Sequence, residues 1–488
     1  MWRCLAILPA LIMLAACNRG VGDGTVDVAY IGDGEDIFAE SVRIGPGAQL
    51  VRSARWEGLV RLDAQGAVVP ALAERWIVTD DGLSYIFRIR ELDRANGDRL
   101  TARAVRRALR QGISDLKGTS LGLDFGKISE VRAITGRVVE IRLKSPMPGL
   151  LQLLAQPELV IAADDLPNGL MAMQRTGDTA LFTPLPPQQR GLPEQGDWED
   201  SIRPVTLQRT TAEEAVTGFA NDRYDVIMGG RVQDLPLAAS GPLSRGTVRL
   251  DGAIGLFGLD IRRPAGFLAS PENREALAMA LDRAALIEPL GVGGWQASTR
   301  IVPAGLPALA NTPRAPRWND QPPATLRDIA ASRVSRWKNA NGAEVQLVVA
   351  LPEGPGAITL FAALAGQFAQ VGVSLVRAAP RQPADLVLRD RTARFDGARW
   401  FLNQFNCTIE PRLCSDEADA LVALASTARD PGEQAQLLAQ AEEVLMAANL
   451  YIPIGAPIRW SQVRSDVPGF AENPWAFHPL FPLSGAPM

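Results

Sequence analysis

The sequence predicts an α/β fold of about three domains. Apolar and polar residues alternate in TVDVAYIG (25–32) and GLSYIFRIR (82–90), which is typical of half-buried strands. Ser270 and Pro271 open a helix through REALAMALDRAALI (274–287), with proline at the first helical position, where its missing N–H does no harm. Mixed strands and helices at this spacing form α/β lobes. The 488 residues suggest about three domains at roughly 150 residues each.

The other elements follow from the same signals in chain order. Thr101 caps a helix in ARAVRRALRQGI (102–113). Further strands are expected at VVEIRLKS (138–145), YDVIMGG (224–230), EVQLVVAL (344–351), SLVRAA (374–379), DLVLRD (385–390) and YIPIGAPIRW (451–460). Further helices are expected at AEEAVTGF (212–219), before Gly372 and from Asp430 to about Asn449. The proline-rich stretches 181–204 and 302–325 are expected to be irregular.

The composition excludes several classes of protein. Fifty Lys and Arg residues against 54 Asp and Glu give a net charge of -4, so no general basic field exists to hold nucleic acid or anionic lipid. Hydrophobic residues make up 47% and charged residues 21%, which is ordinary for a globular protein with a large core. A mainly disordered, collagen-like or polytopic membrane protein is excluded.

The first seventeen residues, MWRCLAILPALIMLAAC, have the form of an export signal. The apolar run from Leu5 to Ala16 is shorter than the roughly 20 residues that a spanning helix needs. Small residues followed by Cys17 resemble the bacterial lipobox, which implies cleavage of residues 1–16 and lipidation of Cys17. The alternative is an ordinary signal peptide with an incidental cysteine.

Two cysteines remain in the mature chain beyond Cys17. Cys407 and Cys414 form an even pair in a compartment expected to be oxidising, and the six residues between them permit a small closed loop. We therefore expect a disulfide. Metal binding is the weaker alternative, because no second Cys or His cluster accompanies the pair.

Several segments in order resemble one known family. ALAERWIVTDDGLSYIFRIRE (71–91), followed by NGDRLTARAVRRALRQ (96–111), is similar to the best-known stretch of the oligopeptide/dipeptide-type solute-binding proteins of ABC transporters, family 5. Further segments match in the right order: VVEIRLKSPMPGLLQLLA (138–155), FGLDIRRPAGF (257–267), NREALAMALDR (273–283), ARDPGEQAQLLAQAEEVL (428–445) and VPGFAENP (467–474). The resemblance covers essentially the whole mature chain.

The resemblance implies a two-lobed periplasmic-binding-protein fold (type II, venus-flytrap) with an extra subdomain inserted in lobe I. The implied divisions are lobe I at 18–45, 175–252 and 466–488, the subdomain at 46–174 and lobe II at 253–465, with hinge strands near 252–254 and 465–467. The lobes would close on a ligand. The implied protein is a monomeric periplasmic lipoprotein without a cofactor, which captures a peptide or peptide-like ligand and delivers it to an ABC permease and ATPase complex.

The expected ligand contact lies in DLVLRDRTARFDGARWFL (385–402). In the family, this stretch contributes the Asp that pairs with a peptide's free amino group. Here Asp390 stands at the family's Gly, Arg391 replaces its Trp, and Arg394 occupies the position of that Asp. Arginine repels an ammonium group and suits a carboxylate. We therefore expect an acidic or non-peptide ligand.

An alternative interpretation is that Arg391 and Arg394 simply pair with Asp390 and Asp396 across a solvated loop. Asp396 is also a candidate for the amine-binding role after a shift in register.

Weaker candidates for the cleft lie elsewhere in the chain. Trp295, in a glycine-rich turn, could stack on a ligand, and Asp260 replaces a family Asn near the expected mouth of the cleft. Thr119 and Ser120 lie where family members contact ligand, although the family's Tyr is absent there.

Two other functions compete with solute transport. GTSLG (118–122) matches the nucleophile-elbow pattern, so Ser120 with His478, the chain's only histidine, could belong to a serine hydrolase. A helix rather than a strand precedes this motif, which argues against that function. The altered motif Thr176-Gly177-Asp178, where the family has "T-G-P", instead leaves open a structural or sensory lipoprotein on the same fold.

Overall fold

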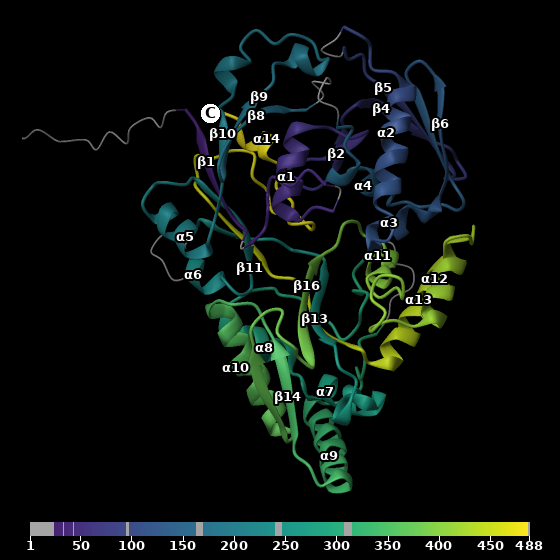
Figure 1. The fold of residues 1–488 in the computed structure, drawn as a ribbon, viewed down its shortest axis with the longest axis vertical. Coiled ribbons are helices and arrows are strands. Elements are labelled where there is room, and N and C mark those ends of the chain that lie inside the picture. Colours follow the sequence, from purple (N-terminus) through teal and green to yellow (C-terminus); the bar gives the residue numbers. More distant parts are fainter. Residues whose placement is uncertain are drawn as a thin grey trace, which may run out of the picture.

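A computed structural model describes residues 24–32, 34–41, 43–93, 97–162, 169–239, 246–306 and 315–486. The signal sequence and Cys17 lie outside these residues. Two lobes and a subdomain are arranged around a central region, with the subdomain beside lobe I and lobe II beneath both in Figure 1. Among the described helices, none has both the length and the apolar character that crossing a membrane requires.

Lobe I is built on a seven-stranded sheet in the order β12-β18-β11-β1-β10-β9-β8. Its strands are β1 (Val26–Ile31), β8 (Met171–Thr176), β9 (Thr179–Pro184), β10 (Val205–Thr210), β11 (Val226–Arg231), β12 (Val248–Leu250) and β18 (Arg459–Val463). Its helices are α1 (Pro46–Arg55), α5 (Ala212–Ala220), α6 (Leu235–Ala239) and α14 (Leu480–Leu483). Strand β1 is parallel to both neighbours and covered on both faces. Val26 and Val28 pack with α1 and α14, whereas Ala29 and Ile31 pack with α5 and α6, as the two-residue period of a strand requires.

Lobe II is built on a five-stranded sheet in the order β15-β14-β16-β13-β17. Its strands are β13 (Gly255–Ile261), β14 (Val345–Ala350), β15 (Val373–Ala378), β16 (Leu386–Thr392) and β17 (Tyr451–Gly455). Its helices are α7 (Pro271–Ala280), α8 (Arg283–Ile287), α9 (Pro323–Asn341), α10 (Pro355–Gln370), α11 (Ala398–Asn403), α12 (Asp416–Ala425) and α13 (Pro431–Ala448). As predicted, α7 begins with Pro271 after Ser270, whose hydroxyl accepts a hydrogen bond from the Asn273 N–H at 3.2 Å.

The subdomain is a four-stranded antiparallel sheet in the order β4-β5-β7-β6 with helix α2 packed on it. Its elements are β2 (Val60–Leu62), β3 (Val68–Pro70), β4 (Ala73–Val78), β5 (Ser84–Ile89), β6 (Ile128–Thr135), β7 (Val138–Leu143), α2 (Ala102–Asp115), α3 (Ser120–Asp124) and α4 (Leu150–Leu154). This part also contains the short 3-10 helices η1 (Phe125–Lys127) and η2 (Pro157–Leu159). Further 3-10 helices lie outside the subdomain, at η3 (Pro187–Arg190), η4 (Glu199–Ser201), η5 (Gly266–Ala269) and η6 (Glu288–Leu290). The predicted strand and capped helix of this part are present, because Thr101 caps α2 by accepting from the Ala104 N–H at 3.3 Å.

The chain crosses between the lobes twice, and the second crossing differs from the prediction. Residues 451–460 were expected to form one strand, with the return to lobe I near 465–467. The structure divides this stretch into β17 of lobe II and β18 of lobe I. Ala456, Pro457 and Ile458 separate the two, and proline has no N–H to continue the ladder. The return therefore lies at 456–458.

The boundary between lobe I and the subdomain also differs from the expected divisions at 46 and 174. Helix α1 packs its apolar residues Leu50, Val51 and Ala54 against the seven-stranded sheet, so it belongs with lobe I. Strand β8 begins at Met171 in the same sheet. The altered motif forms the β8–β9 turn, where Asp178 pairs with Arg209 at 3.0 Å on the surface.

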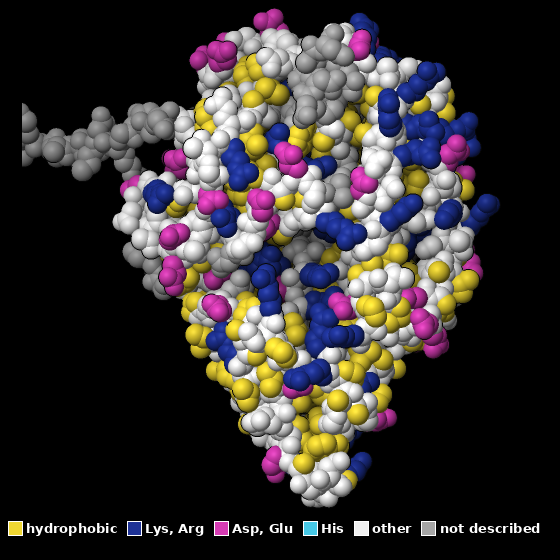
Figure 2. Space-filling view, viewed as in Figure 1, with side chains coloured by type: hydrophobic (Ala, Val, Ile, Leu, Met, Phe, Trp, Pro, Cys, Tyr) yellow, Lys and Arg dark blue, Asp and Glu magenta, His cyan; other side chains and the backbone are white. Residues whose placement is uncertain are grey.

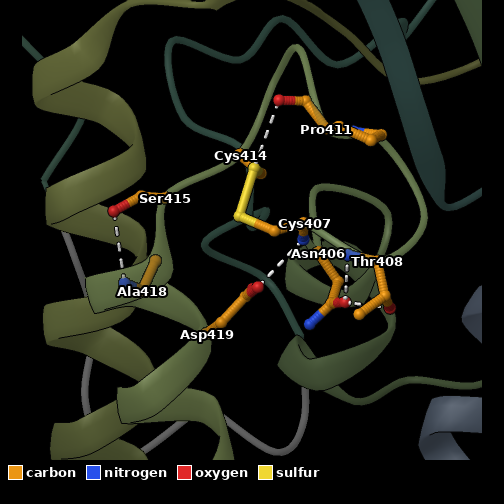
Figure 3. Close-up of a disulfide and its surroundings, with 8 residues drawn as sticks. All are labelled: Asn406, Cys407, Thr408, Pro411, Cys414, Ser415, Ala418 and Asp419. Carbon is orange, nitrogen blue, oxygen red and sulfur yellow. Dashed lines mark hydrogen bonds between the residues drawn. A yellow bond between two sulfur atoms is a disulfide. The ribbon is translucent and has the colours of Figure 1, made fainter.

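A disulfide joins Cys407 and Cys414 in the loop between α11 and α12, with Cα atoms 5.0 Å apart (Figure 3). The Cys407 N–H donates to Asp419 at 2.9 Å, which ties this loop to α12. Asp416 and Asp419 lie close to the Cys407 sulfur. Because that sulfur is in the disulfide, it provides no thiolate for a metal ion.

Candidate ligand-binding cleft

A cavity of about 570 Å³ lies where the two lobes and the subdomain meet, a size in the usual range for small-ligand sites. Lobe I contributes the carboxyl ends of the parallel strands β1 and β11, the edge at which α/β sheets commonly bind ligands. The principal polar and aromatic side chains of the lining are Tyr30, Gln49, Ser120, Gln156, Glu158, Arg231, Asp390, Arg391, Arg394, Trp400, Gln404, Arg459, Trp475 and His478.

Arg394 joins lobe II to the opposite wall of the cleft. It follows β16, and its Nη2 donates to both carboxylate oxygens of Glu158 in η2, at 2.7 and 2.5 Å. Its Nη1 donates to the side-chain oxygen of Gln49 in α1. Gln156 adds a bond from its amide nitrogen to the Arg394 carbonyl at 2.8 Å. Arg394, which the family resemblance places at the amine-binding position, is therefore bound by side chains of the opposite wall.

Arg459 forms the second ion pair across the lobes. Its Nη1 donates to both oxygens of Asp390, at 2.8 and 3.0 Å, and so links β18 of lobe I to β16 of lobe II. Burial lowers the pKa of Arg459, and the Asp390 carboxylate opposes that shift. The alternative prediction, that Arg391 and Arg394 pair with Asp390 and Asp396, is therefore wrong in its partners. Asp390 pairs with Arg459, and Arg394 pairs with Glu158.

Two arginines in the cavity have no carboxylate within 4.0 Å among the described residues. Arg391 donates from Nη1 to the neutral amide oxygen of Gln404 at 2.9 Å. Burial, and secondly the nearby Arg389 cation, lower the pKa of Arg391. Arg231 is the direct cross-strand partner of Arg459 at the end of β11. Like charges placed opposite each other destabilise a sheet. Packing alone therefore does not explain why Arg231 stands opposite Arg459.

The lining therefore carries an excess of positive charge. Its described residues include four arginines (231, 391, 394 and 459) and two carboxylates (Glu158 and Asp390), and both carboxylates are already paired. An irregularity in β11 positions Arg231 at the cavity, because the strand shifts register between Ile227 and Gly230. Glycine is required at position 230, since a side chain there would overlap the Trp460 ring. Charge-assisted bonds to an anion are the chemistry that this arrangement offers.

Four of the eight predicted ligand-contact residues line the cavity: Asp390, Arg391, Arg394 and Ser120. The other four do not. Asp260 is buried in the sheet of lobe II, where both its oxygens accept from Arg389 at 2.7 and 3.0 Å, so its predicted place at the cleft mouth is wrong. Burial lowers the pKa of Arg389, but the Asp260 carboxylate outweighs it and the net shift is upward.

The remaining three predicted residues have local structural contacts. Thr119 caps α3, accepting from the Gly122 N–H at 3.0 Å. The Asp396 N–H donates to Gln152 at 3.3 Å, outside the cavity. Trp295 donates from Nε1 to the Ala456 carbonyl at 2.8 Å and lines a separate cavity of about 580 Å³ beside the two crossings.

Four residues of the lining were not predicted from the sequence: Glu158, Arg231, Arg459 and Gln49. Two signals were available for the arginines. Arg231 follows the buried strand VIMGG, and polar residues at the carboxyl end of such strands commonly face a ligand. Arg459 interrupts an otherwise apolar stretch in YIPIGAPIRW, where a buried cation requires a partner.

Ser120 and His478 both border the cavity, but their contacts do not form a hydrolase triad. Both ring nitrogens of His478 have other neighbours, with Nε2 at 3.1 Å from Asp251 and Nδ1 at 3.1 Å from the Ala471 carbonyl. The His478 ring also stacks on Phe470. No hydrogen bond joins it to Ser120 among the described contacts. A nucleophile–base pair requires that bond.

Known proteins resemble this chain in sequence and in fold. Residues 67–184 match the middle region of the bacterial extracellular solute-binding proteins, family 5. The glutathione-binding protein GsiB of Salmonella paratyphi A is 24% identical over 480 residues, covering 87% of each chain. The chain is therefore similar to family 5 of the solute-binding proteins, through its residues 67–184 and through this relative.

Solved structures show the same two-lobed fold. The murein tripeptide-binding protein MppA of Escherichia coli superposes with a TM-score of 0.77 at 16% identity, covering 95% of this chain and 99% of that one. OppA of Haemophilus influenzae, in complex with RPPGFSPFR, gives 0.76 with the same identity and coverage. The predicted α/β fold class is confirmed. The matched family and these similar proteins are solute-binding proteins, which agrees with the solute-binding role expected from the sequence.

A second contact between the subdomain and lobe II contains buried ionisable groups. Asp124 at the end of α3 accepts from the Asn403 amide of α11 at 2.6 Å, and Lys127 donates to Gln434 of α13 at 3.1 Å. Burial raises the pKa of Asp124 to about 7 and, with the Arg399 cation adding to it, lowers the pKa of Lys127 to about 7. This contact is therefore sensitive to pH near neutrality.

The Arg394–Glu158 pair should control the opening of the ligand-free protein. Arg394→Met leaves Glu158 without its cation, and we expect on the order of 2 kcal/mol in favour of the open form, since Arg394 keeps partial exposure. Small-angle scattering should give a larger radius of gyration for this variant and for Glu158→Gln. The matched control is Arg336→Met on the exposed face of α9. Unchanged radii in both single variants contradict the assignment.

Asp124 should make stability fall as the pH rises. Its pKa is higher in the folded chain, so the stabilisation is complete below the ordinary aspartate pKa of 3.8 and is lost as the pH rises through about 7. The change is at most about 4 kcal/mol, because one pKa unit corresponds to about 1.4 kcal/mol. The melting temperature of Asp124→Asn should therefore fall less between pH 5 and pH 8 than that of the wild type. Asp80→Asn, at an exposed carboxylate, should follow the wild type; identical slopes for all three proteins exclude the effect.

Proposed function

We propose that this protein captures an acidic, peptide-like solute in the cleft and delivers it to the permease and ATPase of an ABC importer. The observation that carries the proposal is the pair Arg231 and Arg391, two cations that line the cavity and have no carboxylate partner among the described residues. A solute with one or two carboxylates supplies the missing charge. Guanidinium groups bind carboxylates through paired, charge-assisted hydrogen bonds.

The relatives support a peptide-like ligand. GsiB is named for glutathione and MppA for murein tripeptide, and OppA is seen with a nonapeptide. Glutathione is itself a small tripeptide with two carboxylates, so its chemistry suits a cationic cleft of about 570 Å³. An ordinary peptide held by its free amino group is a poorer match, because Arg394 stands where the family places the amine-binding Asp and both described carboxylates of the lining are paired.

In this proposal Arg394 and Arg391 have different roles. Arg394 is engaged by Glu158 and Gln49, so it stabilises the closed cleft rather than the ligand. Arg391 keeps donors available beyond its bond to Gln404 and faces the cavity from β16, where the family's peptide ligand would lie as an added strand.

Titration calorimetry tests the ligand class. Glutathione and acidic tripeptides should bind the mature protein more tightly than neutral tripeptides, with affinity that weakens in salt. Arg391→Gln should weaken binding of the acidic ligands by roughly 10- to 100-fold, because a hydrogen bond to a charged group contributes about 1.5–3 kcal/mol. Arg336→Gln, with the same charge change outside the cleft, should bind as the wild type does.

Equal affinity for acidic and neutral peptides would refute the acidic ligand while leaving the solute-binding role intact. If no member of a peptide, sugar-acid and opine panel raises the melting temperature, the structural or sensory alternative is favoured, because ligand that binds the native state must stabilise it.

We also propose that the mature chain begins at a lipidated Cys17 and is anchored to a membrane of the envelope. The support is the signal-like sequence of residues 1–16. In cells fed labelled palmitate, the wild type should take up label and sediment with membranes, whereas Cys17→Ser should take up none. Cys4→Ser is the matched control, because that cysteine leaves with the signal. Labelling of Cys17→Ser contradicts the anchor.

A further inference from the structure

Helix α2 of the subdomain presents a row of arginines to solvent. Arg103, Arg107 and Arg110 recur at intervals of four and three residues, which places them on one face of the helix. All three are exposed, and Arg106 beside them is partly exposed. The opposite face is buried against the sheet. We call the four arginines the α2 basic face. Lys and Arg side chains gather over this part of the subdomain in Figure 2, at the place where Figure 1 shows α2 and β6.

The fold does not use the charge of this face. Arg103, Arg107 and Arg110 have no carboxylate within 4.0 Å among the described residues. Arg106 donates only to a backbone oxygen, the carbonyl of Val131 in β6, at 3.0 Å. Other cations of the subdomain behave differently: Arg88 pairs with Glu74 at 2.6 Å, and Arg142 with Glu140 at 2.9 Å.

The arrangement also opposes the stability of the helix. Arg103 and Arg107, and likewise Arg106 and Arg110, are like charges four residues apart, which repel each other. The first turn contains no acidic residue and the last turn no basic residue, so the charge is placed against the helix dipole. A row of unpaired charges that weakens its own helix is better explained by an external anion than by the fold.

The chemistry of the face favours one class of partner. After the arginines, the last part of α2 exposes Gln111, Ser114 and Asp115, and no large apolar side chain on α2 is exposed. Protein interfaces depend on buried aromatic and apolar anchors, which this face lacks. A surface of anionic lipid headgroups requires only charge, and each basic residue near it contributes to attraction.

We propose that the α2 basic face binds the anionic headgroups of the membrane that carries the anchor, and so orients the subdomain against the lipid. The idea is independent of the ligand in the cleft. It is consistent with the proposed anchor, because Cys17 precedes β1 by only nine positions, and nine extended residues span at most about 30 Å. A chain tethered that closely stays near the membrane.

Vesicle sedimentation tests the proposal. The probe is the full mature chain with Cys17→Ser, mixed with vesicles of phosphatidylcholine alone or of phosphatidylcholine with phosphatidylglycerol. The wild-type face should bind the anionic vesicles only, and less strongly as salt is added. The triple variant R103Q/R107Q/R110Q should bind at least about tenfold more weakly, given the contribution of each basic residue near an anionic surface.

The matched control is R336Q/R412Q/R429Q, which removes the same charge from exposed positions of lobe II. It should bind vesicles as the parent does. Equal losses in both triple variants would show an effect of net charge and overturn the proposal. Absence of binding by the parent would also overturn it and would favour an acidic protein as the partner. The α2 variant should melt no lower than the parent, since glutamine is a good helix former and the repulsion is removed.

Discussion

Two ion pairs hold lobe II against the rest of the molecule, and the character of the cleft depends on them. Arg394 with Glu158 and Arg459 with Asp390 join segments that are distant in the sequence. These pairs also engage both described carboxylates of the cavity. The cations that remain are therefore uncompensated until a ligand arrives. Closure and selectivity for an anion follow from the same distribution of charge, since the side chains that shut the cleft leave it positive.

Local signals predicted the elements well where one stretch of chain determines the outcome. The strand at 82–90 and the helix capped by Thr101 follow from alternation and a side-chain cap, and both are present. The stretch 451–460 was predicted as one strand because its apolar pattern is continuous. Its division depends on which sheet each half joins, and that is decided by pairing with β13 and with β11. Pairing of this kind is a tertiary property that local pattern does not contain.

The candidate site likewise contains residues that the sequence predicted and contacts that it could not predict. Register against the family placed Arg391 and Arg394 at the cleft, and both line it. Their partners could not be predicted, because Glu158 is 236 positions from Arg394 in the chain and no pattern relates them. Asp260 was misplaced for a related reason. It was expected at the mouth of the cleft because it replaces a family Asn there, whereas Arg389 from the adjacent strand neutralises it within the sheet.

The net charge of -4 hides two groups of arginines, one that lines the cleft and one on the outer face of α2. Arg391 lines the cleft, where partial loss of solvent lowers its pKa although the residue remains exposed, and Arg231 in the same lining is partly buried. The arginines of α2 are exposed, so salt screens them and only a dense array of anions holds them. The concave cleft therefore suits one small acidic solute, and the open face of α2 suits an extended anionic surface. Overall composition excludes a general basic field, but local placement determines what each group of cations binds.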